Sequence, residues 1–250
     1  MMKRTKRLLG RIFMGALLLN VLWFLAAILL DTPALVDPVT VYGQIGRVWQ
    51  QSMSLHLLAS LRRIIIGIAI ALLFGLVMAL AMYRYRSFGQ VMDSFVYFCY
   101  PVPKLALLPV IMLLAGLGDA TKIIMIVLII IFQIIINLRD SLRNIPKESF
   151  LVLTSLGATH RQLLRHLLLP AITPEALSTL RVAIGTAISV LFVTETYGTD
   201  RGMGFFIVDA WMRISYTEMY AGIVVLGMSG FFFFLLIDML EAKLCRWRNS

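Results

Sequence analysis

The sequence predicts an all-α, polytopic membrane protein with about six transmembrane helices. Of its 250 residues, 60% are hydrophobic and only 14% are charged, which is more apolar surface than one soluble core of this size can bury. Several apolar runs approach or exceed the roughly 20 residues that cross a bilayer. The charges flank these runs, so the net charge of +10 indicates membrane orientation rather than nucleic-acid binding.

Six spans are expected from the apolar runs. They cover roughly 11–30, 60–82, 93–116, 122–138, 175–197 and 219–240. The connections on one side, with both termini, hold fifteen Lys and Arg residues, whereas those on the opposite side hold four. Cytoplasmic loops carry the excess of basic residues. Both termini and the long connection 139–173 are therefore expected in the cytoplasm.

These spans divide the chain into three parts. Residues 1–59 form an N-terminal anchor helix and an external loop, residues 60–240 form the transmembrane domain, and residues 241–250 form a cytoplasmic tail. The basic start followed by the apolar run Ile12–Leu30 has some features of a signal peptide. However, the run is too long for an h-region and no small-x-small cleavage site follows it, so a retained first span is expected.

The long cytoplasmic connection is basic and amphipathic, which predicts folded structure. A helix is expected over Lys147–Leu156, and Gly157 supplies the left-handed conformation that ends it. Thr159 is a suitable cap for a second helix, His160–Leu169, which Pro170 is expected to end. The alternative is a helix that lies on anionic lipid. The pattern favours two short helices that meet at a glycine.

The third expected span contains three close prolines, Pro101, Pro103 and Pro109. Prolines break a backbone hydrogen-bond ladder that lipid cannot repair, so this stretch is expected to face protein or a water-filled path. A kinked packing helix is the alternative. Lys104, beside these prolines, could attract an anionic solute or extend its ammonium group towards the headgroups.

Polar residues inside other spans also have two explanations each. Gln133 and Asn137 lie four residues apart on one helical face, where they could line a path or form interhelical hydrogen bonds. Arg181, near the cytoplasmic start of the fifth span, could attract an anion or extend towards the headgroups.

Thr194, Glu195 and Thr196 close the fifth span, directly before the glycine-rich stretch 197–206. Ionisable groups at membrane depth are costly and often functional, so Glu195 is a candidate gate residue, with capping or packing as the alternative. The glycines suit a re-entrant external loop. Asp238, near the inner end of the last span, is expected to pair with Lys243.

Enzyme signatures are absent from the sequence. It contains no HExxH, no GxSxG and no G-x4-GK[ST] motif. His160 and His166 are six residues apart, on different helical faces, so they do not predict a metal site. We therefore expect no catalytic residue, no metal and no cofactor in this chain.

The cytoplasmic segment carries the motif G-x9-L-x-LP, formed by Gly157, Leu167, Leu169 and Pro170. This motif resembles the cytoplasmic EAA loop of bacterial ABC-importer permeases. Other stretches resemble the nitrate, sulfonate and taurine group of the binding-protein-dependent transport family; they include SLRRIIIGIAIALLFG, YPVPKLALLPVIMLLAGLGDATKI and TETYGTDRGMGFFIVDA. The resemblance extends from about Trp49 to Trp247.

The resemblance implies a type I importer permease of the bacterial inner membrane. Its cytoplasmic loop would sit in a groove of an ATPase subunit, with contacts from Glu148, Leu151, Val152, Leu153, Gly157, Ala158, Leu163, Leu169 and Pro170. The family's Glu-Ala-Ala aligns with Leu151–Leu153, and the nearest acid is Glu148, one helical turn earlier. The expected path or gate residues are Pro101, Pro103, Lys104, Gln133, Asn137, Arg181 and Glu195.

The resemblance also implies partners. They are a cytoplasmic ABC ATPase dimer, which binds ATP and Mg²⁺, an extracytoplasmic solute-binding protein and a second permease copy, giving a homodimer in membrane lipid; no nucleic acid is expected. The solute would be a small anion or small organic molecule, such as nitrate, a sulfonate or taurine, or a vitamin precursor. A secondary transporter without an ATPase is the alternative, but such proteins often have repeated halves, which this sequence lacks.

Overall fold

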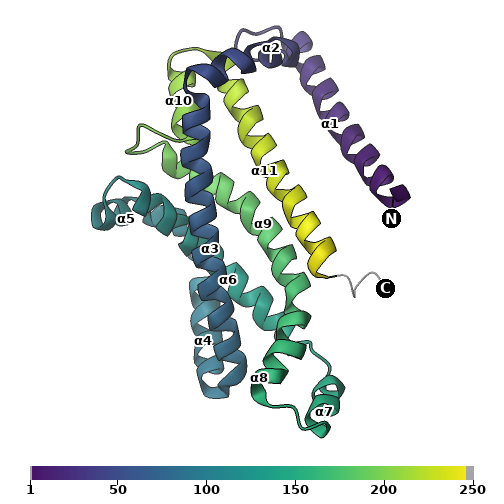
Figure 1. The fold of residues 1–250 in the computed structure, drawn as a ribbon. Coiled ribbons are helices and arrows are strands. Elements are labelled where there is room, and N and C mark those ends of the chain that lie inside the picture. The colour runs from purple at the N-terminus through teal and green to yellow at the C-terminus, as the bar shows by residue number, and fades with distance from the viewer. Residues whose placement is uncertain (1, 246–250) are drawn as a thin grey trace.

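A computed structural model of the protein describes residues 2–245 (Figure 1). The elements are α1 (Met2–Leu30), α2 (Pro38–Val48), η1 (Trp49–Met53), α3 (Ser54–Arg84), α4 (Arg86–Cys99), η2 (Lys104–Leu107), α5 (Leu108–Ala115), α6 (Asp119–Arg143), α7 (Lys147–Ser155), α8 (His160–Leu163), η3 (Leu164–Leu168), α9 (Leu169–Glu195), α10 (Met203–Met212) and α11 (Tyr216–Leu244). Of these, η1 and η3 are π-helical turns and η2 is a 3₁₀ turn. The all-α prediction is confirmed. Residues 246–250 of the expected tail lie outside the described residues.

Among residues 2–245, five helical segments are long and apolar enough to cross a membrane. They are Phe13–Leu30, Pro38–Arg84, Asp119–Arg143, His160–Glu195 and Tyr216–Leu244. A sixth crossing is formed if α4 and the η2–α5 segment count as one span, which is bent by 83° at its break. The expected number of spans is therefore confirmed, with the third one broken.

The break in the third span falls at Pro101 and Pro103, where the sequence predicts it. Neither proline can donate a backbone hydrogen bond, and the chain turns between α4 and η2. Lys104 follows directly. Its ammonium group donates to the carbonyl oxygens of Cys99 at 3.1 Å and Tyr100 at 2.8 Å. Lys104 therefore caps the carbonyl end of α4, a role that neither of its expected explanations included.

Helices α3, α6 and α9 form the centre of the bundle, and their side chains make up the main apolar cluster. Gly67 and Gly75 of α3 allow α6 to approach closely. A Cβ atom at Gly67 would lie 2.7 Å from Cγ2 of Ile126, and one at Gly75 would lie 2.6 Å from Cγ2 of Ile134. Small residues at helix interfaces permit this kind of packing in membranes. This close packing of α3 against α6 stabilises the centre of the bundle.

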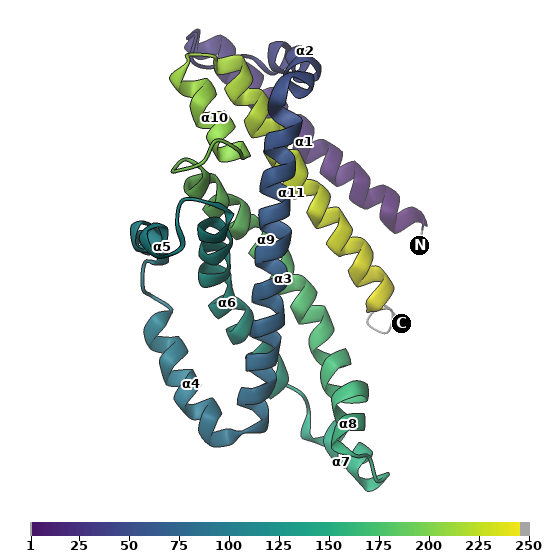
Figure 2. The ribbon, with the colours of Figure 1, turned by 60° about the vertical axis from the view of Figure 1, so that its left-hand side comes forward.

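Helix α1 diverges from the bundle in both views (Figures 1 and 2). Only 6% of its apolar window Phe13–Leu30 is buried, so nearly all side chains of residues 13–30 are available to lipid or to another chain. Near its end, Trp23 Nε1 donates to the carbonyl of Val36 at 3.0 Å, and the Trp23 ring contacts that of Tyr220. These contacts join α1 to the start of α11.

Pro170 does not end the second cytoplasmic helix, contrary to the prediction. Helices α8, η3 and α9 follow one another directly, so one helical segment runs from His160 to Glu195. A proline removes one backbone donor and crowds the preceding turn. Here the π-helical turn η3 precedes Pro170, which occupies the first turn of α9, where proline is tolerated. The helix that contains the expected fifth span therefore begins well before residue 175.

Candidate functional site

The hairpin consists of α7, a short turn and α8, residues 147–163, within the connection that is expected in the cytoplasm. It lies at one end of the molecule, farther out than the adjacent ends of α3 and α4 (Figure 2). Gly157 has φ +76°, and its N–H donates to the carbonyl of Thr154 at 3.0 Å. The N–H of Ala158 donates to the carbonyl of Leu153 at 3.0 Å. This is the Schellman pattern of helix ends, so the predicted glycine stop is confirmed.

The second helix of the hairpin begins with a capping box. Thr159 is the N-cap, and its backbone N–H donates to Oε1 of Gln162 at 2.7 Å. In return, the N–H of Gln162 donates to Oγ1 of Thr159 at 3.4 Å. Two donors that the helix start leaves unpaired are thereby satisfied. The predicted cap at Thr159 is confirmed.

Helix α7 exposes an apolar face. The exposed fractions of Leu151, Val152 and Leu156 are 67%, 59% and 78%. Helical rotation of roughly 100° per residue places Glu148, which is also exposed, on the same side. Such a face in an aqueous compartment indicates a protein contact. The docking face is defined as Glu148, Leu151, Val152 and Leu156.

Apart from the exposed Gly157, the remaining expected coupling residues are less accessible. Leu153, Ala158 and Leu163 are half-buried. Leu169 and Pro170 are half-buried in the first turn of α9, and Leu169 packs against the main apolar cluster. These two residues therefore join the hairpin to the bundle and do not belong to the docking face.

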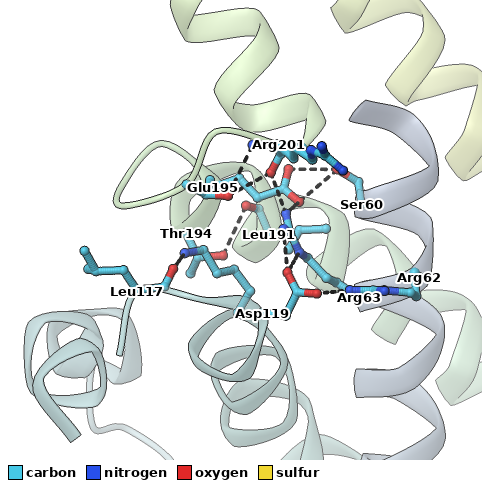
Figure 3. A network of polar contacts seen from close by, with 12 residues as sticks. Ser60, Arg62, Arg63, Leu117, Asp119, Leu191, Thr194, Glu195 and Arg201 are labelled. Carbon is cyan, nitrogen blue, oxygen red and sulfur yellow. Dashed lines mark hydrogen bonds and ion pairs between the residues drawn. The ribbon is translucent and has the colours of Figure 1, made fainter. Parts of the chain in front are cut away.

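A second candidate site is a buried polar network (Figure 3). It lies at the end of α9, at Glu195, which is the end farther from the hairpin. Glu195 is 1% exposed, and its Oε1 accepts from Nη1 of Arg63 at 2.6 Å. Its Oε2 lies 2.8 Å from the hydroxyl oxygen of Ser60 and accepts from the N–H of Gly204 at 2.9 Å. The carboxylate thus joins α9 to α3 and α10.

Arg63 extends the network to α6. Its Nε donates to Oδ1 of Asp119 at 2.8 Å, and its Nη1 donates to the carbonyl of Arg201 at 2.8 Å. The exposed Arg62 also pairs with Asp119. A buried guanidinium that meets two carboxylates and a carbonyl has its charge and its donors satisfied. Four helices therefore meet at one set of charged groups.

The loops on this side are tied to the same network. Lys122 is fully buried, and its ammonium group donates to the carbonyls of Leu117 and, at 3.3 Å, Gly198. It thus connects the turn before α6 to the loop after α9. The N–H of Gly202 donates to Nδ1 of His56 at 3.2 Å, which connects the same loop to α3.

Two glycines make room for the carboxylate. Gly202 has φ +133°, and a Cβ atom there would lie 2.2 Å from Cδ of Glu195. At Gly204, a Cβ atom would lie 2.4 Å from the carbonyl oxygen of Phe192. The glycines are thus required because the backbone approaches Glu195 closely. The sequence interpretation did not include this reason for the glycine-rich stretch.

Sequence reasoning named Glu195 but missed its partners Ser60 and Arg63. It also missed the nearby Asp119, which pairs with Arg63, and the buried Lys122. A signal was present: Arg63 and Lys122 lie within or at the ends of apolar spans, where a cation requires a partner. Asp119 and Glu195 lie at span ends that face the same side of the membrane under the positive-inside rule. Two cations and two carboxylates at one level predict ion pairs, although not which pairs form.

Two other expected path residues, Asn137 and Arg181, have structural partners. Asn137 Nδ2 donates to Oγ1 of Thr179 at 3.1 Å, which agrees with the interhelical alternative. Gln133 is half-buried on the same helix. Arg181 pairs with Asp238 and, at 3.2 Å, with Glu241 of α11. The expected Asp238–Lys243 pair is therefore wrong, because a longer cation on the neighbouring helix occupies Asp238.

A surface cavity lies near each end of the bundle. One, of about 550 Å³, borders the buried network; its lining includes Leu58, Arg62, Asp119, Gly198 and Arg201. The other, of about 560 Å³, lies between the end of α6, the start of α7 and the start of α9; its lining includes Asn137, Asp140, Asn144, Ser149 and Glu175. Both cavities are lined by polar and apolar groups.

Comparison with known proteins agrees with this architecture. Residues 71–246 match the family described as binding-protein-dependent transport system inner membrane component. The chain is 30% identical over 247 residues to the taurine transport system permease protein TauC of Escherichia coli (strain K12), covering 94% of this chain and 88% of that protein. It is 28% identical over 235 residues to the formylaminopyrimidine transport permease protein ThiX of Halalkalibacterium halodurans, covering 94% of each.

Among solved structures, an inward-facing conformation of the MetNI methionine ABC transporter has the same fold. The TM-score is 0.64 at 18% identity, and the match covers 74% of this chain and 93% of that chain. The type I importer fold and the inner-membrane location expected from the sequence are confirmed. The chain belongs to the binding-protein-dependent transport family, as one of its multi-pass inner-membrane permease subunits.

Proposed function

We propose that this permease subunit forms the path for a small solute in an importer driven by a separate cytoplasmic ATPase. The observation that carries the proposal is the docking face of α7. It presents three exposed leucine or valine side chains and one carboxylate on a helix that projects from the bundle. An apolar face of this kind is stabilised when a protein partner removes it from water.

The shape of the hairpin favours docking into a groove of a protein rather than binding to a lipid surface. A helix that lies on lipid needs its apolar face and a basic polar face along one continuous axis. Here α7 is stopped by the Schellman turn at Gly157, and the chain reverses into α8. The basic residue Arg161 belongs to the second arm, and Arg165 lies in η3, which follows that arm. The two arms form a compact projection that fits a groove.

The missing glutamate of the family motif changes the expected contact. Leu151 stands where the family has its glutamate, and it is two-thirds exposed. We infer that the ATPase groove contacts this chain mainly through apolar side chains. Glu148, one turn earlier on the same face, is the carboxylate placed to meet a basic residue of the groove.

The remaining partners follow from the number of hairpins. One chain carries one hairpin, and an ATPase dimer needs two, so the complete importer contains two permease subunits; we propose a homodimer. ATP and Mg²⁺ bind to the ATPase subunits. A binding protein delivers the solute on the extracytoplasmic side, where the Arg63–Glu195 network lies.

The solute class is proposed from the relatives. Their names specify taurine, aliphatic sulfonates and formylaminopyrimidine, so we propose a small sulfonate-like anion or a small heterocyclic vitamin precursor. The structure gives no separate support for an anion, because Lys104 caps α4 and Arg181 is paired with carboxylates. Neither cation is left free for a solute.

Co-purification tests the proposal. A tagged chain, co-expressed with the ATPase encoded beside it, is expected to retain that ATPase, and deletion of residues 151–163 is expected to abolish both retention and uptake. A finer variant is Leu151→Asp with Leu156→Asp. The matched control is Val39→Asp, which places a carboxylate on an equally exposed apolar residue of α2. A chain that takes up solute without its hairpin would be a secondary transporter, and the proposal would be wrong.

A further inference from the structure

The face of α7 opposite the docking face makes a contact with the bundle. Phe150 is half-buried, and its ring stacks on that of Tyr83, with centroids 6.3 Å apart and planes 23° apart. Tyr83 belongs to the last turn of α3. Aromatic pairs attract each other at this separation. The stack therefore joins the first arm of the hairpin to a central helix of the bundle.

The geometry of α7 places this stack directly behind the docking face. Each residue rotates the side chain by roughly 100°, so Phe150 points away from the side that carries Leu151, Val152 and Leu156. A partner seated on the docking face would push α7 along the line that leads to Phe150. The next side chain on that line is Tyr83.

The hairpin is thus connected to two central helices. Its second arm continues through η3 into α9, and its first arm reaches α3 through the aromatic stack. At their far ends, α3 and α9 are joined again by the Arg63–Glu195 ion pair. The two helices are therefore linked at both ends, and a movement of the hairpin acts on both.

Without the stack, the first arm would be held by its half-buried Ser149 and Leu153 and by the short connections at its ends. These are the turn 144–146 after α6 and the turn around Gly157. Neither turn restrains the rotation of this nine-residue helix as strongly as a packed pair of rings does. Loss of either ring would leave the docking face intact but would loosen its connection to α3.

We propose that Phe150 and Tyr83 are positioning residues that transmit movement of the ATPase-bound hairpin to α3. This inference rests on the proposed function, because it requires an ATPase on the docking face. It assigns the two faces of α7 different tasks: the outer face binds the partner, and Phe150 on the inner face converts movement of that partner into movement of the spans.

The test separates coupling from binding and does not need the solute to be known. Tyr197, in the loop after α9, is 55% exposed; Tyr197→Cys reports the state of the extracytoplasmic end through its reaction with a membrane-impermeant maleimide. Right-side-out vesicles carry this chain with its co-expressed ATPase and contain either ATP or no nucleotide. The ATP-dependent change in labelling rate is compared with ATP hydrolysis in the same preparation.

Phe150→Ala and Tyr83→Ala are each expected to retain the ATPase and to hydrolyse ATP, while the ATP-dependent change in labelling falls by about fivefold or more. Tyr83→Phe keeps the ring and is expected to behave as the parent chain. The double alanine variant is expected to be no worse than either single variant, because both remove the same contact. Tyr85→Ala is the matched control: it removes an exposed ring two residues away that contacts Arg84.

Three results would overturn the inference. They are an unchanged labelling response in Phe150→Ala, an equal loss in Tyr85→Ala, and loss of the ATPase from the Phe150→Ala complex, which would make the ring part of the binding surface. Failure of the proposed function has a different signature. In that case the parent chain itself would not retain the ATPase, or would show no labelling response to ATP.

Discussion

Glu195 and Arg63 form an ion pair that is almost completely removed from solvent. The carboxylate and guanidinium groups are 2.6 Å apart, with side chains 1% and 5% exposed. The residues come from the end of α9 and the outer part of α3. Removing one partner of a buried pair leaves an uncompensated charge, which is far more costly than the pair itself is stabilising.

Arg63→Ala is therefore expected to destabilise the protein strongly. The expected loss is about 3–5 kcal/mol, which for a chain of this size lowers the melting temperature by about 6 °C or more. Thermal unfolding of the purified protein in detergent measures the shift. Arg62→Ala is the control, because Arg62 also pairs with Asp119 but is 63% exposed, and exposed pairs contribute about 1 kcal/mol or less. Equal shifts in the two variants would show that burial of the pair does not matter.

Gly202→Ala is expected to disrupt the same network by steric conflict. The residue has φ +133°, and the new methyl group would overlap the carboxylate of Glu195. Gly227→Ala provides the comparison: Gly227 lies within α11, and no atom lies within 4 Å of its added Cβ. We expect a lower yield and melting temperature for Gly202→Ala and no loss for Gly227→Ala. A Gly202→Ala protein as stable as the parent would contradict the close packing around Glu195.

Gly157→Ala is expected to affect the hairpin without affecting the bundle. The added Cβ meets no atom within 4 Å, so the cost comes from the backbone at φ +76° and amounts to about 1–2 kcal/mol. The melting temperature should stay unchanged while retention of the ATPase falls severalfold. Gly157→Asn should retain the ATPase better, because asparagine tolerates the left-handed region. Equal retention in all three proteins would count against a strained turn.

The N-cap of α2 predicts a local dependence on pH. The carboxylate of Asp37 accepts from the hydroxyl of Thr40 at 2.6 Å and from its N–H at 3.0 Å, and these hydrogen bonds lower the pKa of Asp37 below its ordinary value of 3.8. A lowered pKa means that the stabilisation is fully present above the ordinary value. It is lost as the pH falls through the lowered value.

Hydrogen exchange of the first amides of α2 measures this effect between about pH 5 and about pH 3. We expect protection of these amides, relative to Asp37→Asn, to decrease as the pH falls. Asparagine is an uncharged cap with similar geometry, so its contribution does not titrate. A constant ratio across this range would show that the charge of Asp37 does not contribute.

Local signals were sufficient for much of this fold. The stop at Gly157, the cap at Thr159 and the break at Pro101 and Pro103 depend on residues close together in sequence, and each lies where the pattern predicts it. The same local rule failed at Pro170. The π-helical turn before it has no distinct sequence pattern, and it allows the helix to continue.

The charged network could not be predicted at the same level. Arg63 and Glu195 are separated by 132 residues, so their pairing depends on how α3, α6 and α9 pack. Asp119 and Lys122 gain their roles from the same packing. The pairing of Asp238 also depends on helix packing. Lys243, a neighbour of Asp238 in the sequence, was expected as the partner of Asp238, but α9 places Arg181 beside this carboxylate instead.

The unbroken course of α8, η3 and α9 also sets the distance between the hairpin and the buried network at Glu195. The segment His160–Glu195 contains 36 residues, which corresponds to about 54 Å at 1.5 Å per residue. The hydrocarbon layer is about 30 Å thick. If the helix stands along the membrane normal, roughly 20 Å of this segment lies outside the hydrocarbon. A protein bound at its cytoplasmic end is then held clear of the lipid headgroups, at a distance set by the number of residues between Thr159 and the membrane surface.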